Sequence, residues 1–252
     1  DHPQYNCTPK SYGLEYSTVQ LTSRKDNLEL AAWYVPYQDA KRAIVLVHGR
    51  DASKQNAISG KLPALAAELH RAGLTVLMLD LRGHGGSEGK RYTWGVFERR
   101  DVLGAVDFLV GEEFPPERIA LLGISLGGAA VVGAALEKPA VGALVLDSTF
   151  ADLKALVEPN WRKESGLPRL FLSSAFLMWQ AMYRFDLRKV SPARELAQLR
   201  TKPVLIMHSR SDATVPVEHG IQLAAAAPHG GLALFEYCDH AELSRDASEH
   251  EL

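Results

Sequence analysis

The chain has 252 residues, which suits one α/β domain, and 46% of them are hydrophobic, enough for a large core. Its formal net charge is −2 with both signs interspersed, which argues against a nucleic acid partner. No apolar stretch of about 18 residues occurs, so the sequence offers no membrane-spanning segment.

The first hundred residues alternate between strand-like and helix-like segments. Residues 1–13 are polar and contain two prolines and a glycine, which predicts an irregular lead-in. Residues 16–22 alternate between apolar and polar side chains and predict a half-buried strand. A second strand is predicted over 28–35 after a turn, so the two predict a hairpin. Apolar runs predict strands over 43–47 and 75–79, and helical spacing predicts helices over 61–72 and 96–110.

A serine lies at the centre of residues 123–127 (GISLG). An apolar run of strand length (118–122) precedes it, and a run of small residues with helical composition (128–136) follows. Ser125 is therefore expected at a sharp strand-to-helix turn, where flanking side chains would clash and glycine is needed. The N–H groups of the following helix would face any negative charge beside its hydroxyl. This pattern predicts a serine nucleophile.

The second half of the chain resumes the alternation after an interruption. Strands are predicted over 141–146, 203–207 and 232–237, and a helix over 217–227. The residues after His240 look helical and polar. Strand–helix alternation at this spacing predicts a parallel sheet covered by helices on both faces.

The interruption, at about residues 150–199, is rich in aromatic residues. Its position between two late strands favours a small helical cap that lines an apolar pocket. Five residues are predicted to line this pocket: Trp161, Phe171, Phe176, Trp179 and Tyr183.

A serine nucleophile needs a base and a third group that orients the base. In a parallel sheet such groups come from loops at the carboxyl ends of strands, which selects Asp212 and His240. His240 alone among nine histidines follows the last predicted strand directly. Asp147 also follows a strand and is the rival acid, whereas Asp239 adjoins His240 and is poorly placed to orient its ring.

Two backbone N–H groups are expected to form an oxyanion hole. One belongs to Leu126, which follows the serine, and the second to Arg50, with Asp51 as the alternative. His48 is expected to pack beneath that loop. Three polar residues after the strand at 75–79 are expected to brace a neighbouring loop: Asp80, Arg82 and His84.

From about residue 16 onward the chain resembles the α/β-hydrolase superfamily. The motifs that carry this resemblance, together with His240, are 123–128 (GISLGG), 48–49 (HG), 80–87 (DLRGHGGS) and 211–216 (SDATVP). The opening hairpin, with 12–16 (YGLEY) and 30–36 (LAAWYVP), is similar to a bacterial branch of esterase-like members. The resemblance implies a mostly parallel eight-stranded sheet. With the length and the alternation of elements, we expect one domain over 1–252, with helices on both faces and a cap insertion at about 150–199.

The function that follows is that of a serine hydrolase that cleaves small-molecule carboxylic esters through an acyl-enzyme, with Ser125, Asp212 and His240 as its catalytic residues. No metal or organic cofactor is expected. A peptidase or thioesterase with the same residues remains open, as does a non-catalytic binding domain on this fold. A dehalogenase is disfavoured, because its chemistry needs a carboxylate in place of Ser125.

The two ends of the chain carry further expectations. Many members of the esterase-like branch have an N-terminal membrane anchor, which would explain a chain that begins at Asp1, so a cytoplasmic or a membrane-tethered location stays open. Only residues 241–252 follow His240, fewer than the final helix of family members usually needs. The natural substrate and the oligomeric state are also left open.

Overall fold

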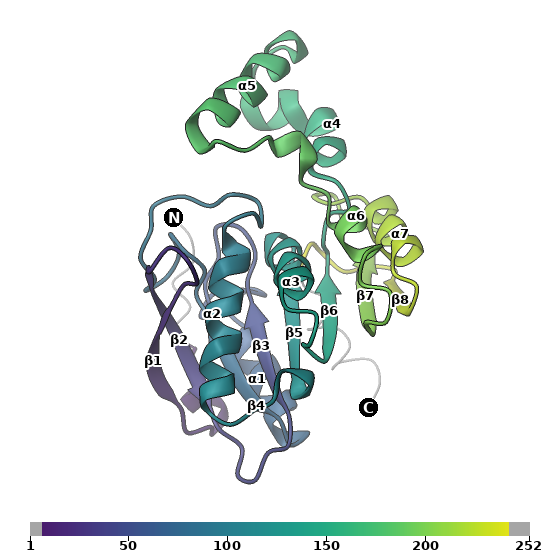
Figure 1. Ribbon diagram of the computed structural model, residues 1–252. Coiled ribbons are helices and arrows are strands. Elements are labelled where there is room, and N and C mark those ends of the chain that lie inside the picture. The colour runs from purple at the N-terminus through teal and green to yellow at the C-terminus, as the bar shows by residue number, and fades with distance from the viewer. Residues whose placement is uncertain (1–6, 242–252) are drawn as a thin grey trace.

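The computed structural model describes residues 7–241, apart from the side chain of Glu164. These residues contain an eight-stranded sheet in the order β1-β2-β4-β3-β5-β6-β7-β8 (Figure 1). Strand β2 (Glu29–Val35) runs antiparallel to both of its neighbours, β1 (Ser17–Thr22) and β4 (Thr75–Leu79), and the other neighbouring pairs are parallel. The remaining strands are β3 (Ala43–Val47), β5 (Ile119–Ile124), β6 (Ala143–Asp147), β7 (Val204–Ser209) and β8 (Gly230–Phe235). The mostly parallel eight-stranded sheet is thereby confirmed.

Helices cover both faces of this sheet. The α-helices are α1 (Leu62–Arg71), α2 (Glu98–Gly111), α3 (Leu126–Glu137), α4 (Leu153–Ser165), α5 (Leu172–Tyr183), α6 (Pro192–Leu196) and α7 (Val217–Ala226). The described residues also form short 3₁₀-helices: η1 (Pro9–Tyr12), η2 (Pro116–Arg118), η3 (Arg169–Phe171) and η4 (Leu187–Lys189). Side chains of α2, α3, α6 and α7 belong to the core on one face, and those of α1 belong to the core on the other.

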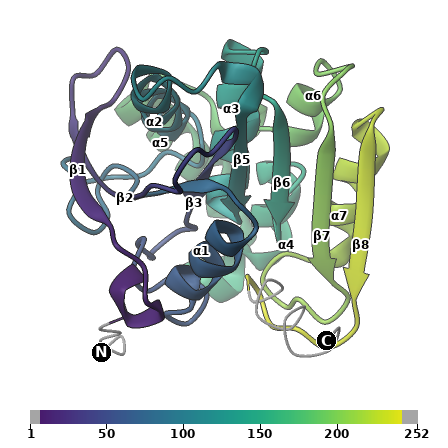
Figure 2. The same ribbon diagram turned by 90° about the horizontal axis from the view of Figure 1, so that it is seen from below.

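The centre of the sheet is fully buried, because helices lie against both of its faces. Every residue of β3 and β4 is buried, and both strands have the predicted bounds. Strands β1 and β8 form the two edges (Figure 2). The functional loops therefore extend from a rigid central sheet.

Some element ends differ from the prediction. Residues 9–12 form η1 within the expected irregular lead-in, with Pro9 at its first position, where the missing proline N–H is tolerated. Strand β7 continues two residues further than expected, because His208 and Ser209 pair with β8. The polar helix predicted after residue 240 lies outside the described residues. No helix between residues 7 and 241 is both long and apolar enough to cross a membrane.

The segment between β6 and β7 leaves the sheet and returns to the same point. Figure 1 shows α4 and α5 standing above the sheet, whereas α6 lies close to α3. At the base of the segment the Leu153 N–H donates to the Val190 carbonyl at 3.0 Å. The Ala151 carbonyl accepts hydrogen bonds from the Ala193 N–H at 3.0 Å and the Ser191 hydroxyl at 3.2 Å. We call this hydrogen-bonded base, where the two ends of the segment meet, the neck.

Candidate active site

Ser125 occupies the turn between β5 and α3 in a backbone conformation that non-glycine residues rarely adopt, with φ 53° and ψ −114°. Close packing of the backbone explains the neighbouring glycines. A Cβ atom on Gly123 would lie 2.4 Å from the Gly127 carbonyl oxygen, and one on Gly127 would lie 2.5 Å from the carbonyl oxygens of Val47 and His48. The turn therefore presents the serine hydroxyl at the N-terminus of α3.

A chain of two hydrogen bonds joins Ser125, His240 and Asp212. His240 Nε2 lies 3.0 Å from Ser125 Oγ, and His240 Nδ1 lies 2.7 Å from Asp212 Oδ2. The second carboxylate oxygen of Asp212 accepts the N–H groups of Thr214 at 2.9 Å and Val215 at 2.8 Å. The structure thus brings together the three residues that the sequence singled out for catalysis.

Electrostatics fix the proton positions in this chain. Burial alone would raise the pKa of the Asp212 carboxyl, but the hydrogen bond to His240, its charge and the two backbone N–H groups outweigh burial and lower that pKa below its usual value. An ionised Asp212 can only accept, so His240 Nδ1 carries the donated proton. His240 Nε2 is then free to accept the proton of Ser125.

The rival acid, Asp147, has a different environment. Its carboxylate accepts the Ser148 hydroxyl at 2.9 Å and makes no hydrogen bond to His240. Burial raises the pKa of Asp147 to about 6, despite that hydrogen bond. The Ser148 hydroxyl accepts the Ala241 N–H at 3.1 Å, so Asp147 and Ser148 together brace the backbone beside His240.

A second buried histidine, His208, lies behind Asp212 and was not singled out from the sequence. Its Nε2 atom lies 2.8 Å from the Val215 carbonyl oxygen and 3.7 Å from Asp212 Oδ2. Burial lowers the pKa of His208, so the ring is neutral and donates to Val215. Its position at the carboxyl end of β7 is the signal that could have identified it.

Two backbone N–H groups beside Ser125 have no acceptor among the described residues. Leu126 begins α3, so its N–H has no acceptor within the helix. The Arg50 N–H likewise donates to none of the residues 7–241, and the adjacent Gly49 packs so closely that a Cβ there would lie 3.2 Å from Ser125 Cβ. The alternative donor, the Asp51 N–H, is directed to His84 Nε2 at 3.3 Å. This geometry favours Arg50 over Asp51.

The polar residues around the neighbouring loops brace those loops, as expected. His48 Nδ1 donates to the Gly49 carbonyl at 2.7 Å and its Nε2 accepts the Leu81 N–H at 3.0 Å, and burial lowers the pKa of His48 to about 4. Asp80 accepts the Lys54 N–H at 2.7 Å and the Gly86 N–H at 2.8 Å. Arg82 is held by Asp101, Asp26 and Ser23, and His84 by the Arg82 carbonyl and the Asp51 N–H.

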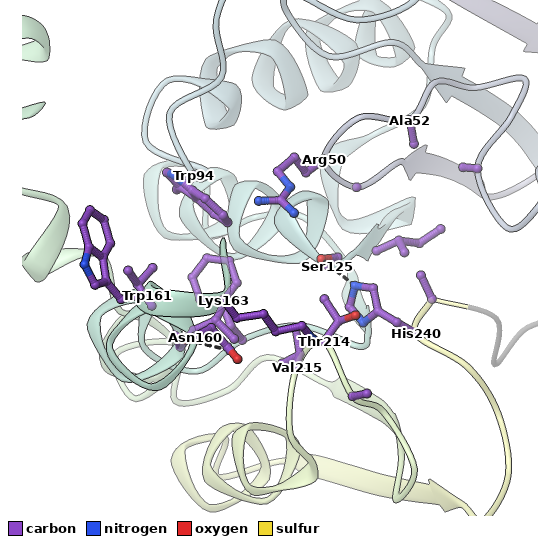
Figure 3. Close-up of a pocket in the computed structure, with 18 of the residues that line it drawn as sticks. Arg50, Ala52, Trp94, Ser125, Asn160, Trp161, Lys163, Thr214, Val215 and His240 are labelled. Atoms are coloured by element: carbon purple, nitrogen blue, oxygen red, sulfur yellow. Dashed lines mark hydrogen bonds between the residues drawn. The ribbon is translucent and has the colours of Figure 1, made fainter. Parts of the chain in front are cut away.

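A cavity of about 470 Å³ opens beside Ser125 and His240 (Figure 3). Its walls come from the loop after β3, from the loop before α2, from α4 and from the loop after β7. The larger side chains in these walls are Arg50, Trp94, Phe150, Leu156, Val157, Asn160, Trp161, Lys163, Thr214 and Val215. Apart from Arg50, Lys163 and His240 the described lining residues are not ionisable, so the cavity suits an apolar group with a few polar contacts.

Only Trp161 of the five predicted pocket aromatics lines this cavity. Phe176 and Trp179 pack with Leu153 and Leu187 in the apolar cluster of the cap, behind cavity-lining residues that belong to the same cluster. Tyr183 stacks on Trp179 with ring centroids 4.6 Å apart. Phe171 lies on η3 and is 46% exposed. The structure does not place these four residues in the lining of this cavity: Phe176 and Trp179 pack inside the cap, and Phe171 lies on its exposed surface.

The aromatic residues that do line the cavity, besides Trp161, are Trp94 and Phe150. Phe150 follows the end of β6 by three residues, so the rule of functional loops at strand ends could have identified it. Trp94 lies in the loop before α2, where no sequence pattern marks it. Among the side chains that the structure describes, which leave out Glu164, no group of three or more His, Cys, Asp or Glu could hold a metal ion.

Comparison with known proteins places the chain in a family. Residues 38–184 match the family model for serine aminopeptidase S33 hydrolases, which is more than half of the chain. The chain belongs to this family of α/β hydrolases. It is 30% identical over 210 residues to an uncharacterized protein of Mycobacterium tuberculosis, and the match covers 82% of this chain. The chain spans 66% of the length of that relative.

Solved structures agree with the fold of this S33-family chain. A Pyrococcus furiosus esterase superposes with a TM-score of 0.78 at 22% identity, covering 99% of this chain and 93% of the esterase. The esterase domain of a Rhodothermus marinus protein superposes with a TM-score of 0.66 at 25% identity, covering 93% and 94% respectively. The α/β-hydrolase fold is therefore shared with esterases.

Proposed function

We propose that this hydrolase cleaves carboxylic esters through an acyl-enzyme formed on Ser125. The observation that carries the proposal is the hydrogen-bonded chain from Ser125 Oγ through His240 to the ionised Asp212. This chain supplies a nucleophile, a general base and a group that orients the base, which are the three roles that acyl transfer from serine requires.

The reaction begins with attack of Ser125 Oγ on the ester carbonyl while His240 Nε2 takes the hydroxyl proton. The carbonyl oxygen becomes an oxyanion, which the N–H groups of Leu126 and Arg50 stabilise. His240 then gives its proton to the leaving alcohol. In the second half His240 takes a proton from water, the resulting hydroxide attacks the acyl carbonyl, and the proton returns to Ser125 as the acid leaves.

An ester suits the cavity better than the N-terminus of a peptide. An aminopeptidase has to hold the α-ammonium group of its substrate, for which a carboxylate is the natural partner. The described cavity lining contains no Asp or Glu side chain, and its two charged residues, Arg50 and Lys163, are both cations. The apolar wall formed by Trp94, Phe150 and Leu156 fits an acyl or alcohol chain instead.

A panel of p-nitrophenyl acetate, butyrate and octanoate, matched thioesters and aminoacyl anilides tests this assignment, with Ser125→Ala as the control. We expect ester hydrolysis by the wild type, none above background by the variant, and labelling of Ser125 by a fluorophosphonate probe. Preferred cleavage of aminoacyl anilides would make the protein a peptidase. No labelling and no turnover of any substrate would leave a non-catalytic domain on this fold.

A further inference from the structure

Helix α5 is an exposed helix without a single charged residue, since Leu172–Tyr183 reads LSSAFLMWQAMY. Its inner face is buried through Leu172 and Phe176. Its outer face carries Leu177, Met178 and Met182, which are 60%, 63% and 53% exposed. Solvent-facing helix surfaces normally carry charged side chains, so an apolar outer face calls for a physical explanation.

The apolar surface continues into the chain before α5. Leu170 is 73% exposed, and Leu167 and Phe171 are each 46% exposed. We call the six residues the cap face: Leu167, Leu170, Phe171, Leu177, Met178 and Met182. They make up half of the twelve large hydrophobic side chains that are exposed among the described residues, and they fall within sixteen consecutive positions.

Basic residues outnumber acidic ones in the segment that carries the cap face. Arg169 precedes α5 with its side chain 74% exposed, although it lies 3.8 Å from the Glu158 carboxylate, and Arg184 follows the helix directly as its exposed C-cap. Residues 162–189 contain six basic and two acidic residues, a net charge of +4, although the whole chain has a net charge of −2. The part of the sequence that carries the exposed apolar side chains is therefore also rich in basic residues.

The exposed apolar side chains and the basic residues together indicate which kind of partner the cap face binds. If two copies of the chain docked through their cap faces, two segments of net positive charge would meet, and their repulsion would oppose association. An uncharged helix of twelve residues is too short to cross a bilayer but suits the interfacial plane, where apolar side chains enter the acyl region and arginines reach headgroup phosphates. We propose that the cap face binds the surface of a bilayer that contains anionic lipids.

The cap face adjoins the wall of the cavity. Trp161 lines the cavity, and its Nε1 donates to the Pro168 carbonyl at 3.1 Å, between Leu167 and Arg169. In Figure 1, α5 is the element furthest from the sheet, so it can meet a flat surface without obstruction from the rest of the fold. Binding would hold the cavity side of α4 near the lipid headgroups, and it does not depend on the hydrolase reaction.

Vesicle co-sedimentation of the full chain tests the proposal, with one set of vesicles of phosphatidylcholine alone and another of equal parts phosphatidylcholine and phosphatidylglycerol. We expect binding to the mixed vesicles that falls at least about tenfold on phosphatidylcholine alone or in high salt, because several basic residues contribute to it. The Arg169→Gln/Arg184→Gln variant should bind the mixed vesicles more weakly than the wild type does, as the wild type itself does in high salt.

The apolar contribution is tested by Leu177→Glu/Met178→Glu, which should lower binding to mixed vesicles at least about tenfold. The matched control is Ile221→Glu on α7, a side chain that is 46% exposed and outside the cap face, and which should leave binding unchanged. Melting temperatures of all variants, measured in parallel, should stay near that of the wild type because the replaced side chains are exposed.

Three results would overturn the proposal. A dimer in analytical ultracentrifugation that Leu177→Glu/Met178→Glu dissociates, without vesicle binding, would make the cap face an interface between copies. Equal binding to both kinds of vesicle would remove the role of anionic lipid. A monomer that binds neither vesicle would show that the cap face has no lipid affinity. Ester hydrolysis is measured separately, so none of these results tests the proposed reaction.

Discussion

His240 Nε2 lies 3.0 Å from Ser125 Oγ, although the two residues are 115 positions apart in the chain. Ser125 follows β5 and His240 follows β8, and β6 and β7 lie between these strands in the sheet. The alignment of the nucleophile with its base therefore depends on the pairing of four parallel strands and on the loop that carries His240 back across their ends.

Removal of the nucleophile should abolish hydrolysis without unfolding the protein. Ser125→Ala is expected to lower kcat by about 10⁴-fold or more, because the three hydrogen-bonded residues act as a unit. The melting temperature should not fall, since the Ser125 side chain supports no element of the fold. Steady-state kinetics on p-nitrophenyl butyrate and thermal melting provide the two measurements. Activity within tenfold of the wild type would contradict the assignment.

The two buried aspartates should differ sharply in their effect on activity. Asp212→Asn is expected to lower kcat by about 10⁴-fold, because an amide no longer fixes the His240 tautomer. Asp147→Asn should keep kcat within about tenfold, since its side chain contacts Ser148 and not His240. Parallel kinetics at pH 8 compare the two variants, and an equal loss in both would mean that Asp147 shares the orienting role.

The stability of the protein should depend on pH through Asp147. Its pKa rises from 3.8 to about 6 on folding, so the folded state binds this proton more tightly and stability falls as pH increases through 6. The buried charge then costs about 3 kcal/mol at pH 8. Asp147→Asn should be more stable than the wild type at pH 8, and the gain should vanish near pH 4, as measured by urea unfolding.

Asp212→Asn provides the control of opposite sign for that measurement. The pKa of Asp212 is lowered in the folded protein, so ionised Asp212 adds stability that is present at pH 8 and is lost as pH falls through its folded pKa. The variant should be less stable than the wild type at pH 8, with a deficit that shrinks on acidification. A gain for both variants at pH 8 would contradict the assigned environments.

The cavity wall should determine chain-length preference. Trp161→Ala is expected to lower kcat/KM for p-nitrophenyl octanoate by about 10- to 200-fold and to leave acetate hydrolysis nearly unchanged, because a lost apolar contact affects only a chain that reaches it. Phe171→Ala, outside the cavity, is the matched control and should affect neither ester. Uniform loss across both esters with a lowered melting temperature would mean that Trp161 supports the fold.

The glycine after the serine turn should be sensitive to one methyl group. Gly127→Ala would place its Cβ 2.5 Å from two backbone oxygens and should destabilise the protein by about 1–3 kcal/mol. Gly111→Ala, at the end of α2 with nothing within 4 Å of the added atom, should be neutral or stabilising by up to about 1 kcal/mol. Urea unfolding of both variants gives the comparison.

The buried strands and the catalytic loops could be predicted from the sequence, because both follow from short stretches of neighbouring residues. Buried strands such as β3 and β4 are continuous apolar runs bounded by turn residues, so their bounds were predicted without error. Functional loops follow the carboxyl ends of parallel strands, and this rule brought Asp212 and His240 to Ser125 once the alternation of elements had been recognised.

The lining of the cavity could not be predicted in the same way. Helix α5 has apolar residues on every side, so the spacing of its apolar residues does not show which face is buried. Phe176 is buried in the cap, whereas its neighbour Leu177 is exposed to solvent. Trp94 reaches the cavity because its loop folds against the end of β6, where its ring lies 6.1 Å from that of Phe150. Such contacts depend on the position of whole elements.

The neck between Leu153 and Val190 has a consequence for the modularity of this fold. Because the segment enters and leaves at one hydrogen-bonded point, residues can be inserted or deleted within it while the separation of β6 and β7 is kept. Ser125, Asp212 and His240 all lie outside that point. A segment from another protein of this fold, joined at the neck, would thus replace one wall of the cavity. The positions of Ser125 and His240 relative to each other would not change.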